Sequence, residues 1–397
     1  MPDFKKEALE VQKEVSAFRR HIHEYPEMGL HLPETTAYVM GELKNMGYEP
    51  KEICDSGVVA VLKGGKPGKC VMLRADMDAL PIEEDSGEPF SSKHAGICHA
   101  CGHDAHTAML LGAAKILKAH QAEICGTVKF LFQPGEETGK GALAVLNAGV
   151  LENPHVDTCI GFHQTVGRHD NPTGQIGFTP GMAMASADVF RITVTGKSAH
   201  GAKPEAGISP IAVLVNIYEQ LQMIETLEIP REAPLALTIG QIESGKAGNA
   251  IPDKGIMCGT IRTYSKEVRA YVRKRLVEIT EGTAKTLRAE AQVEFTAGMA
   301  GLYNDPEIGA EMWRYAKEAV GAENCADQPP IMASEDFAFI LEKCPGVYMR
   351  VSLGDQEEGY TGIPHNAKFR INEAGMPNAV AVYCNCAYEW LKAHANL

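Results

Sequence analysis

The sequence has 397 residues, of which 45% are apolar and 22% charged, and its formal net charge is −13 at pH 7. A chain of this length is expected to form two or three domains with ample hydrophobic core. The acidic balance argues against nucleic acid or an anionic membrane surface as the main partner. There is no run of roughly 20 apolar residues, as a membrane helix requires, and no apolar segment typical of a secretory signal near the start, which together predict a cytoplasmic protein.

The 11 cysteines are irregularly spaced along the chain. In a cytoplasmic protein this predicts reduced and mostly buried thiols, not a disulfide framework. One or two of them are candidate metal ligands.

The first half of the chain alternates amphipathic segments with short apolar runs. Helices are predicted at 4–24, 34–46, 104–119 and near 139–149, with Asp104 as the N-cap of the third. Strands are predicted at Val58–Lys63, Cys70–Ala75, Thr127–Phe132 and Asp157–Phe162, and the turn sequence GGKPG between the first two predicts a hairpin. Strands that alternate with helices indicate an α/β fold with a mostly parallel sheet and helices on both faces.

Residues 186–297 show a different order of elements. The predicted order is strand Asp188–Thr195, helix 207–226, strands Leu235–Glu243 and Ile256–Tyr264, helix 265–289 and strand Ala291–Thr296. This β-α-β-β-α-β order is that of a ferredoxin-like α+β domain. A helix near 306–320, a strand at Gly346–Leu353 and a helix at 373–394 then resume the first pattern. We therefore predict a discontinuous α/β domain, 1–185 and 298–397, with the domain 186–297 inserted into it.

Polar side chains gather where the predicted strands of the larger domain end. Asp78 follows one strand, Glu136 and Glu137 follow the next, His163 follows a third, and His365 lies in the loop after the last. Ligands of open parallel sheets bind beyond the carboxyl ends of the strands. We therefore expect these residues to converge, although they are far apart in sequence.

A further cluster, Cys98-His99-Ala100-Cys101-Gly102-His103-Asp104-Ala105-His106, lies on a loop that enters a helix. Its Cys and His residues are closer together than the ligands of the usual structural zinc site. A redox Cys-x-x-Cys pair would need the helix to begin at the first cysteine, whereas it is predicted to begin after His103. The favoured interpretation is that Cys101 and His103 bind a metal together with donors from distant strands.

The adjacent carboxylates Glu136 and Glu137 repel each other unless a positive group lies between them or one is protonated. In an extended loop their side chains diverge, so one carboxylate can bind a metal while the other holds a water, as metal-assisted hydrolysis requires. Asp78 suits a supporting role, in which it orients an imidazole or bridges to the site. Asp76 is ambiguous, because Arg74 is near enough in sequence to pair with it.

The remaining histidines are not predicted to be ligands. His99 and His106 flank the cluster. Eight others have no convergent context and are expected to be surface or structural residues: His21, His23, His31, His94, His120, His155, His169 and His394.

Short motifs along nearly the whole chain carry a resemblance to a known family. They are HIHEYPE (21–27), LRADMDALP (73–81), HACGHDAH (99–106), FQPGEE (132–137), GKSAHGAKP (196–204), GNAIPD (248–253), GTIRT (259–263), SEDF (334–337) and Pro364–His365. In these motifs and their order the sequence resembles the M20 metallopeptidases, specifically the amidohydrolase branch with hippurate hydrolases, indole-acetyl-amino acid hydrolases and N-acyl-L-amino acid amidohydrolases.

The resemblance implies a role for each matching residue. The implied ligands of one or two divalent ions are Cys101, His103, Glu137, His163 and His365, with Glu136 as general base and acid and Asp78 as support. Zinc is the expected metal, and manganese, cobalt and nickel remain open because the thiolate Cys101 replaces a carboxylate-type bridging ligand. In the inserted domain the matching residues are His200, which suits a developing oxyanion, Arg262, which suits a substrate carboxylate, and Asn249.

The function that the resemblance implies is metal-dependent hydrolysis of N-acyl amino acids to a carboxylic acid and a free amino acid. A dipeptidase or aminopeptidase of the same family is the alternative, and a non-catalytic metal-binding protein is a third hypothesis. The larger domain would be catalytic, and the inserted domain would act as a lid and dimerisation domain. The expected partners are a small-molecule substrate and a second copy of the chain, with no nucleic acid or membrane.

Overall fold

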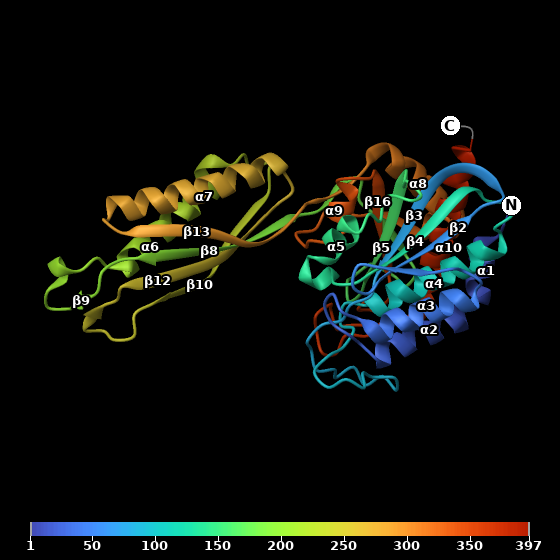
Figure 1. The fold of residues 1–397 in the computed structure, drawn as a ribbon, viewed down its shortest axis with the longest axis horizontal. Helices are drawn as coiled ribbons and strands as arrows, with labels where there is room; N and C mark the ends of the chain where they lie inside the picture. The colour runs from blue at the N-terminus through green and yellow to red at the C-terminus, as the bar shows by residue number, and fades with distance from the viewer. Residues whose placement is uncertain (1, 396–397) are drawn as a thin grey trace. The chain divides into compact units, whose positions relative to one another are not determined.

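The computed structural model describes residues 2–395, and the chain divides into two compact units (Figure 1). The first contains the residues up to Gly181, Tyr303–Pro329 and the residues from Asp336 on, and the second contains Met182–Leu302 and Pro330–Glu335. The domain prediction from the sequence included residues 330–335 in the larger domain. They belong to the second unit because the carbonyls of Ile331 and Ala333 accept the N–H of Ala185.

An eight-stranded sheet forms the centre of the first unit. Its strands, in spatial order, are β1 (Lys51–Ile53), β2 (Gly57–Lys63), β4 (Cys125–Gln133), β3 (Lys66–Asp76), β5 (Thr158–Thr165), β16 (Gly346–Ser352), β6 (Ile176–Phe178) and β15 (Cys325–Asp327). The central strands β4, β3, β5 and β16 are parallel, whereas β2 and β6 each run antiparallel to their central neighbour. This confirms the predicted mostly parallel sheet.

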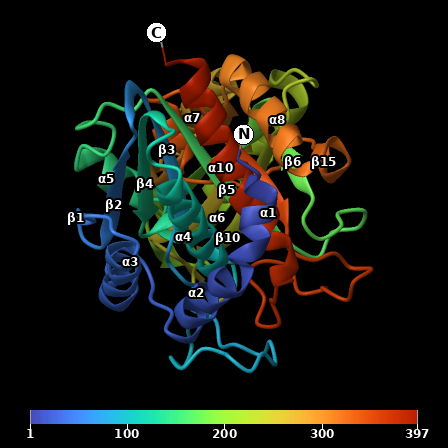
Figure 2. The same ribbon diagram turned by 90° about the vertical axis from the view of Figure 1, so that its right-hand side faces the viewer.

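Helices cover both faces of this sheet. They are α1 (Phe4–Glu10), α2 (Gln12–Glu24), α3 (Pro33–Asn45), α4 (His103–Ala119), α5 (Gly141–Asn147), α8 (Pro306–Val320), α9 (Ala338–Leu341) and α10 (Met376–Ala393), with the short turns η1 (Glu136–Thr138), η4 (Ala322–Asn324) and η5 (Glu373–Gly375). Figure 2 shows α4 and α10 against β3 and β4. Of the helices in residues 2–395, none has the length and apolarity needed to cross a bilayer.

The two faces of β3 show how the sequence specifies these layers. Val71 and Leu73 point to one face and join the core formed with α4 and α10. Arg74, the next residue after Leu73, points to the other face of the sheet. There its guanidinium lies 5.3 Å from the ring centre of Phe337 at the start of α9. Because both faces are covered, the strand is buried along its second half, as its continuous apolar run indicates.

Three sequence predictions about this unit were wrong in detail. β2 and β3 do not form a hairpin, because β4 lies between them and pairs with both. Gly64 in the connection passes so close to the carbonyl of Ile124 that a Cβ there would lie 2.2 Å from its oxygen. The first predicted helix is interrupted at Val11, and α4 is capped by Gly102 and not by Asp104.

The second unit has the predicted β-α-β-β-α-β order. It consists of β8 (Ser186–Thr195), α6 (Pro210–Met223), β10 (Leu235–Ser244), β12 (Lys254–Thr263), α7 (Lys266–Thr286) and β13 (Glu290–Met299). The four strands form an antiparallel sheet in the ferredoxin-like order β10-β12-β8-β13. Short additions are β9 (Ala199–His200), which pairs with β11 (Ala250–Ile251), and the turns η2 (Pro204–Ala206) and η3 (Ile224–Glu228). The paired strands β7 (Gly181–Met184) and β14 (Leu302–Asn304) contain the positions where the chain passes from one unit to the other.

Candidate metal centre

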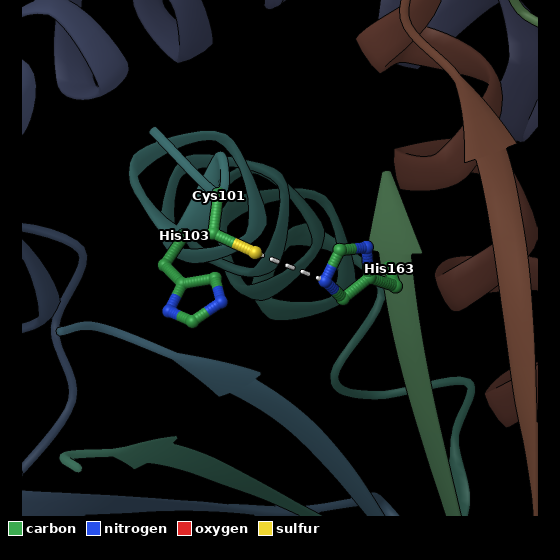
Figure 3. Close-up of side chains that lie close together, drawn as sticks. All are labelled: Cys101, His103 and His163. Atoms are coloured by element: carbon green, nitrogen blue, oxygen red, sulfur yellow. Dashed lines mark hydrogen bonds between the residues drawn. The ribbon is translucent and has the colours of Figure 1, made fainter. Parts of the chain in front are cut away.

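Three of the predicted ligands face one another at the carboxyl end of β5 (Figure 3). Cys101 lies on the loop before α4, His103 is the first residue of α4, and His163 lies on β5. The Sγ atom of Cys101 is 3.5 Å from Nε2 of His163, and donor atoms of all three residues lie within 4.8 Å of one another. The sequence placed His163 just after its strand, whereas the strand in fact continues through it to Thr165.

The turn between Cys101 and His103 requires glycine. Gly102 has a φ of +78°, in the left-handed region that favours glycine, and a Cβ there would lie 2.7 Å from Cγ of Gln164. The turn therefore allows the predicted ligands Cys101 and His103, two residues apart, to bring their donor atoms close together.

Glu137 and His365 complete the set. Oε1 of Glu137 lies 3.9 Å from Nε2 of His103 and 3.4 Å from Nε2 of His365. The backbone N–H of His365 donates to the carbonyl of Ala100 at 2.8 Å, which fixes the loop of His365 beside the segment of Cys101. The structure thus brings together all five residues that the sequence named as ligands.

Asp78 connects the two carboxylates to this cluster. Its carboxylate accepts the backbone N–H groups of Glu136 at 2.9 Å and Glu137 at 3.0 Å, and its Oδ1 lies 3.4 Å from Nδ1 of His103. Glu136 and Glu137 do not lie in an extended loop, as the sequence predicted, but begin the 3₁₀ turn η1. A helical turn leaves its first N–H groups without partners, and a carboxylate is the favoured acceptor there.

Several buried atoms of the cluster have no hydrogen-bond partner among the described residues. Neither ring nitrogen of His103, nor Oε1 of Glu137, forms a hydrogen bond with any described residue, although all three atoms are buried. Such atoms are rare in proteins. Since thiol, imidazole and carboxylate donors are those that zinc and related ions prefer, the residues fit a divalent metal ion.

Burial sets the protonation of two of these residues. It lowers the pKa of His163 to about 3, with a further contribution from the nearby His106, so the imidazole is neutral and able to donate a lone pair. It raises the pKa of Cys101 to about 12, so the thiol is protonated until a cation replaces the proton.

Asp76 and His106 lie beside His103 but already have partners. Oδ2 of Asp76 accepts from Nη1 of Arg74 at 2.6 Å, and its Oδ1 accepts from Nδ1 of His106 at 2.6 Å. The other ring nitrogen of His106 accepts the backbone N–H of Gln164 at 2.8 Å. We therefore regard Asp76 and His106 as supports of the cluster and not as ligands.

The candidate residues of the second unit lie at two ends of its four-stranded sheet. His200 and Asn249 are neighbours, because His200 pairs with Ala250. Arg262 lies opposite Ala187 and donates from Nη1 to the carbonyl of Met332 at 2.9 Å. Ala187 is on β8, which ends at Thr195, eight residues or about 26 Å further along the strand. β9, which contains His200, follows this far end of β8. This unit therefore brings His200 and Asn249 together but not Arg262.

The sequence did not reveal a buried charged network behind the ligand loop. Oδ2 of Asp104 accepts from Nε of Arg19 at 2.9 Å and from Nδ1 of His23 at 2.8 Å, and Nε2 of His23 lies 3.1 Å from Oε1 of Glu84. Asp104 directly follows the predicted ligand His103, so the network fixes the first turn of α4. The HIHEYPE motif, which contains His23, was the one feature of the sequence that marked this network, but it did not indicate which residue His23 would pair with.

A mixed thiol, imidazole and carboxylate cluster beside a second carboxylate is typical of metal-dependent hydrolases. The chain belongs to peptidase family M20/M25/M40, whose model matches residues 72–389. It is 39% identical to N-acetyl-L-cysteine deacetylase of Bacillus subtilis, over 93% of this chain and 86% of that protein. It is 35% identical to IAA-amino acid hydrolase ILR1-like 4 of Arabidopsis thaliana, over 94% of this chain and 84% of that protein.

A solved structure agrees with this assignment. The Bacillus subtilis YXEP protein, described as a dinuclear metal-binding peptidase of family M20, is 32% identical and superposes with a TM-score of 0.81, covering 96% of this chain and 98% of that one. The family predicted from the sequence motifs is thereby confirmed.

Proposed function

We propose that this protein hydrolyses the amide bond of N-acyl amino acids and releases a carboxylic acid and a free amino acid. The observation that carries the proposal is the convergence of five donors from separate segments around the unpartnered atoms of His103 and Glu137, with Glu136 beside them. The similarity to a deacetylase of N-acetyl-L-cysteine and to an IAA-amino acid hydrolase supports an amide substrate with an amino-acid half.

We assign the chemistry to Glu136 and the ligand set to Cys101, His103, Glu137, His163 and His365. A bound divalent ion would polarise the substrate carbonyl and lower the pKa of a water. Glu136 would take the proton of the attacking water and return it to the leaving amine nitrogen. Its placement supports this role, because Asp78 holds its backbone N–H and Oε1 accepts the N–H of Asp336 at 3.3 Å.

The second unit would bind the rest of the substrate. Arg262 suits a bidentate contact to the carboxylate of the amino-acid half, and His200 suits the developing oxyanion, with Asn249 as a polar contact. Because His200 and Arg262 lie at opposite ends of the sheet, a single copy of this unit is poorly arranged to place both on one small molecule. We therefore assign His200 and Asn249 to the site of a second copy in a homodimer.

Helix α6 offers a surface for such a dimer. Three large apolar side chains at helical spacing along it are exposed, namely Ile211, Val215 and Tyr218. Contiguous exposed apolar side chains of this kind are typical of protein–protein interfaces. The unit would then serve as a dimerisation domain as well as a lid.

The metal and the compartment complete the proposal. Zinc is the ion we assign to the mixed sulfur, nitrogen and oxygen donors, with manganese, cobalt and nickel as the alternatives that metal analysis of the purified protein distinguishes. All 11 cysteines are unpaired, which supports the reducing environment of the cytoplasm.

The decisive experiment compares two substrate classes with metal-supplemented protein. N-acetyl, N-benzoyl and N-indole-acetyl amino acids are incubated beside dipeptides of the same C-terminal residue with a free α-amine, and the released amino acid is quantified. We expect turnover of at least one N-acyl substrate to exceed that of its matched dipeptide. Faster turnover of the dipeptides identifies a dipeptidase or aminopeptidase. If the wild-type protein releases no more amino acid from either substrate class than Glu136→Gln does, the enzymatic function is overturned.

A further inference from the structure

Strand β5 loses its neighbour β3 before it reaches His163. The β3–β5 ladder runs from Val71 opposite Thr158 to Arg74 opposite Gly161, where it ends. β5 continues to Thr165 with β16 on its other edge. The peptide groups on the β3 side of this last part therefore need partners other than a strand, since buried backbone groups are rarely left unpaired.

At Gln164 two imidazole rings supply these partners. The N–H of Gln164 donates to Nε2 of His106 at 2.8 Å, and its carbonyl accepts from Nδ1 of His163 at 2.6 Å. Its side-chain amide also donates to the carbonyl of Cys101 at 3.0 Å. Gln164 therefore connects two of the proposed ligands, and His106 holds its backbone in place.

The ring of His106 is itself held in one orientation. It is fully buried, and because its Nε2 accepts a hydrogen bond, its Nδ1 carries the proton that it donates to Asp76. Arg74 pairs with the other oxygen of Asp76 and so fixes that carboxylate. The rings of His106 and His163 meet edge to face with their centres 4.7 Å apart.

We propose that His106 is a positioning residue that replaces the missing strand neighbour of β5 and thereby holds Nε2 of His163 toward Cys101. The inference rests on the metal centre of the proposed function. His106 acts through Gln164 and does not bind the ion, since both of its ring nitrogens are engaged. Residues that orient metal ligands in this way typically change metal affinity or activity 10- to 100-fold when they are replaced.

The test is a titration with Co²⁺, whose visible absorption reports ligand geometry independently of activity. We compare the wild-type protein with His106→Leu, which loses both hydrogen bonds, and with His106→Gln, whose side-chain oxygen can still accept the N–H of Gln164. The matched control is Thr107→Val, because Thr107 is a buried neighbour on the same helix whose hydroxyl donates to the carbonyl of Asp76 at 2.7 Å. Circular dichroism and thermal unfolding establish that each variant is folded.

We expect His106→Leu to weaken Co²⁺ binding by about 10- to 100-fold and to shift the visible bands, His106→Gln to recover part of both, and Thr107→Val to match the wild type. A folded His106→Leu with wild-type affinity and spectrum overturns the inference, as does a Thr107→Val effect of equal size. If His106→Leu does not fold, His106→Asn, too short to reach Gln164, replaces it, and equal affinities of the Asn and Gln variants overturn the inference. A wild-type protein that binds no Co²⁺ instead overturns the proposed metal centre itself.

Discussion

The Nδ1 atom of His103 lies 3.4 Å from Oδ1 of Asp78, which is buried just after the end of β3. The same carboxylate accepts the backbone N–H groups of Glu136 and Glu137. One side chain thus sets the position of the first residue of α4 and of the turn that carries both glutamates.

Replacing Asp78 should therefore weaken both metal binding and turnover. For Asp78→Ala we expect kcat and metal affinity each to fall by about 10- to 100-fold, because two backbone N–H groups lose their acceptor and His103 loses its neighbouring carboxylate. Asp78→Asn keeps one acceptor oxygen and should lose less. Metal content after dialysis and steady-state kinetics measure the two effects, and a folded Asp78→Ala variant with wild-type values of both would show that Asp78 is dispensable.

Replacing each of the adjacent glutamates with a neutral side chain should have different effects on metal content and turnover. Glu136→Gln removes the proposed proton carrier but no proposed ligand, so we expect a loss of kcat of at least ~10²-fold with nearly unchanged metal content. Glu137→Gln removes a proposed ligand and should lose metal as well as activity. Metal analysis beside kinetics distinguishes them, and equal metal loss in the two variants would contradict the assigned roles.

Removing the metal should lower the stability of the protein. A ligand that binds only the folded state stabilises it by about 2.7 kcal/mol at a free concentration of 100 times its Kd. We expect dialysis against a chelator to lower Tm by several degrees and re-addition of Zn²⁺ to restore it. Because binding has to displace the proton of Cys101, whose pKa burial raises to about 12, metal affinity should increase with pH. A Tm insensitive to chelator and metal would contradict the centre.

The His23–Asp104 pair predicts a dependence of stability on pH. Burial by itself would lower the pKa of His23, but Asp104 and Glu84 outweigh it and raise that pKa to about 9. The folded state therefore binds a proton that the unfolded state releases near pH 6.5, so the stabilisation is complete below about pH 6.5 and is lost as the pH rises toward 9, by about 3 kcal/mol.

Denaturant unfolding at pH 6, 7.5 and 9 tests this dependence. The free energy of unfolding of the wild type should decline over that range, and His23→Gln should remove most of the decline. His155→Gln, at an exposed position, serves as the control and should leave the wild-type slope unchanged. A slope that His23→Gln does not reduce would show that other groups cause it.

Mixing two inactive variants tests whether His200 serves a second copy. If it does, a heterodimer of His200→Ala and Glu136→Gln contains one site with both native residues, and random subunit exchange in an equal mixture should restore about one quarter of the wild-type activity. Activity of the separate and mixed proteins, with size-exclusion chromatography to establish exchange, provides the measurement. No recovery from exchanged dimers would place His200 and Glu136 in the same chain's site.

Much of the fold could be read from local patterns. The period of apolar residues located most helices and strands, and the β-α-β-β-α-β order between Ser186 and Met299 predicted the ferredoxin-like sheet. The pairing of β2 with β4 could not be read in this way, because a turn such as GGKPG fixes a change of direction but not which strand will lie alongside. That choice depends on which faces the whole sheet has to bury.

For the candidate metal centre, the sequence by itself predicted the five donors, since the motifs that contain them resemble those of a known family, and the structure brings these five residues close together. Only the tertiary structure decided the roles of the polar residues around them. Asp76 was ambiguous in the sequence, because Arg74 was near enough to pair with it, and it does so. Asp104 was predicted to cap a helix, but in the structure it pairs with Arg19 and His23. The folded chain selects one set of partners, because a buried charge is stable only where the packed elements bring a complementary group within hydrogen-bonding distance.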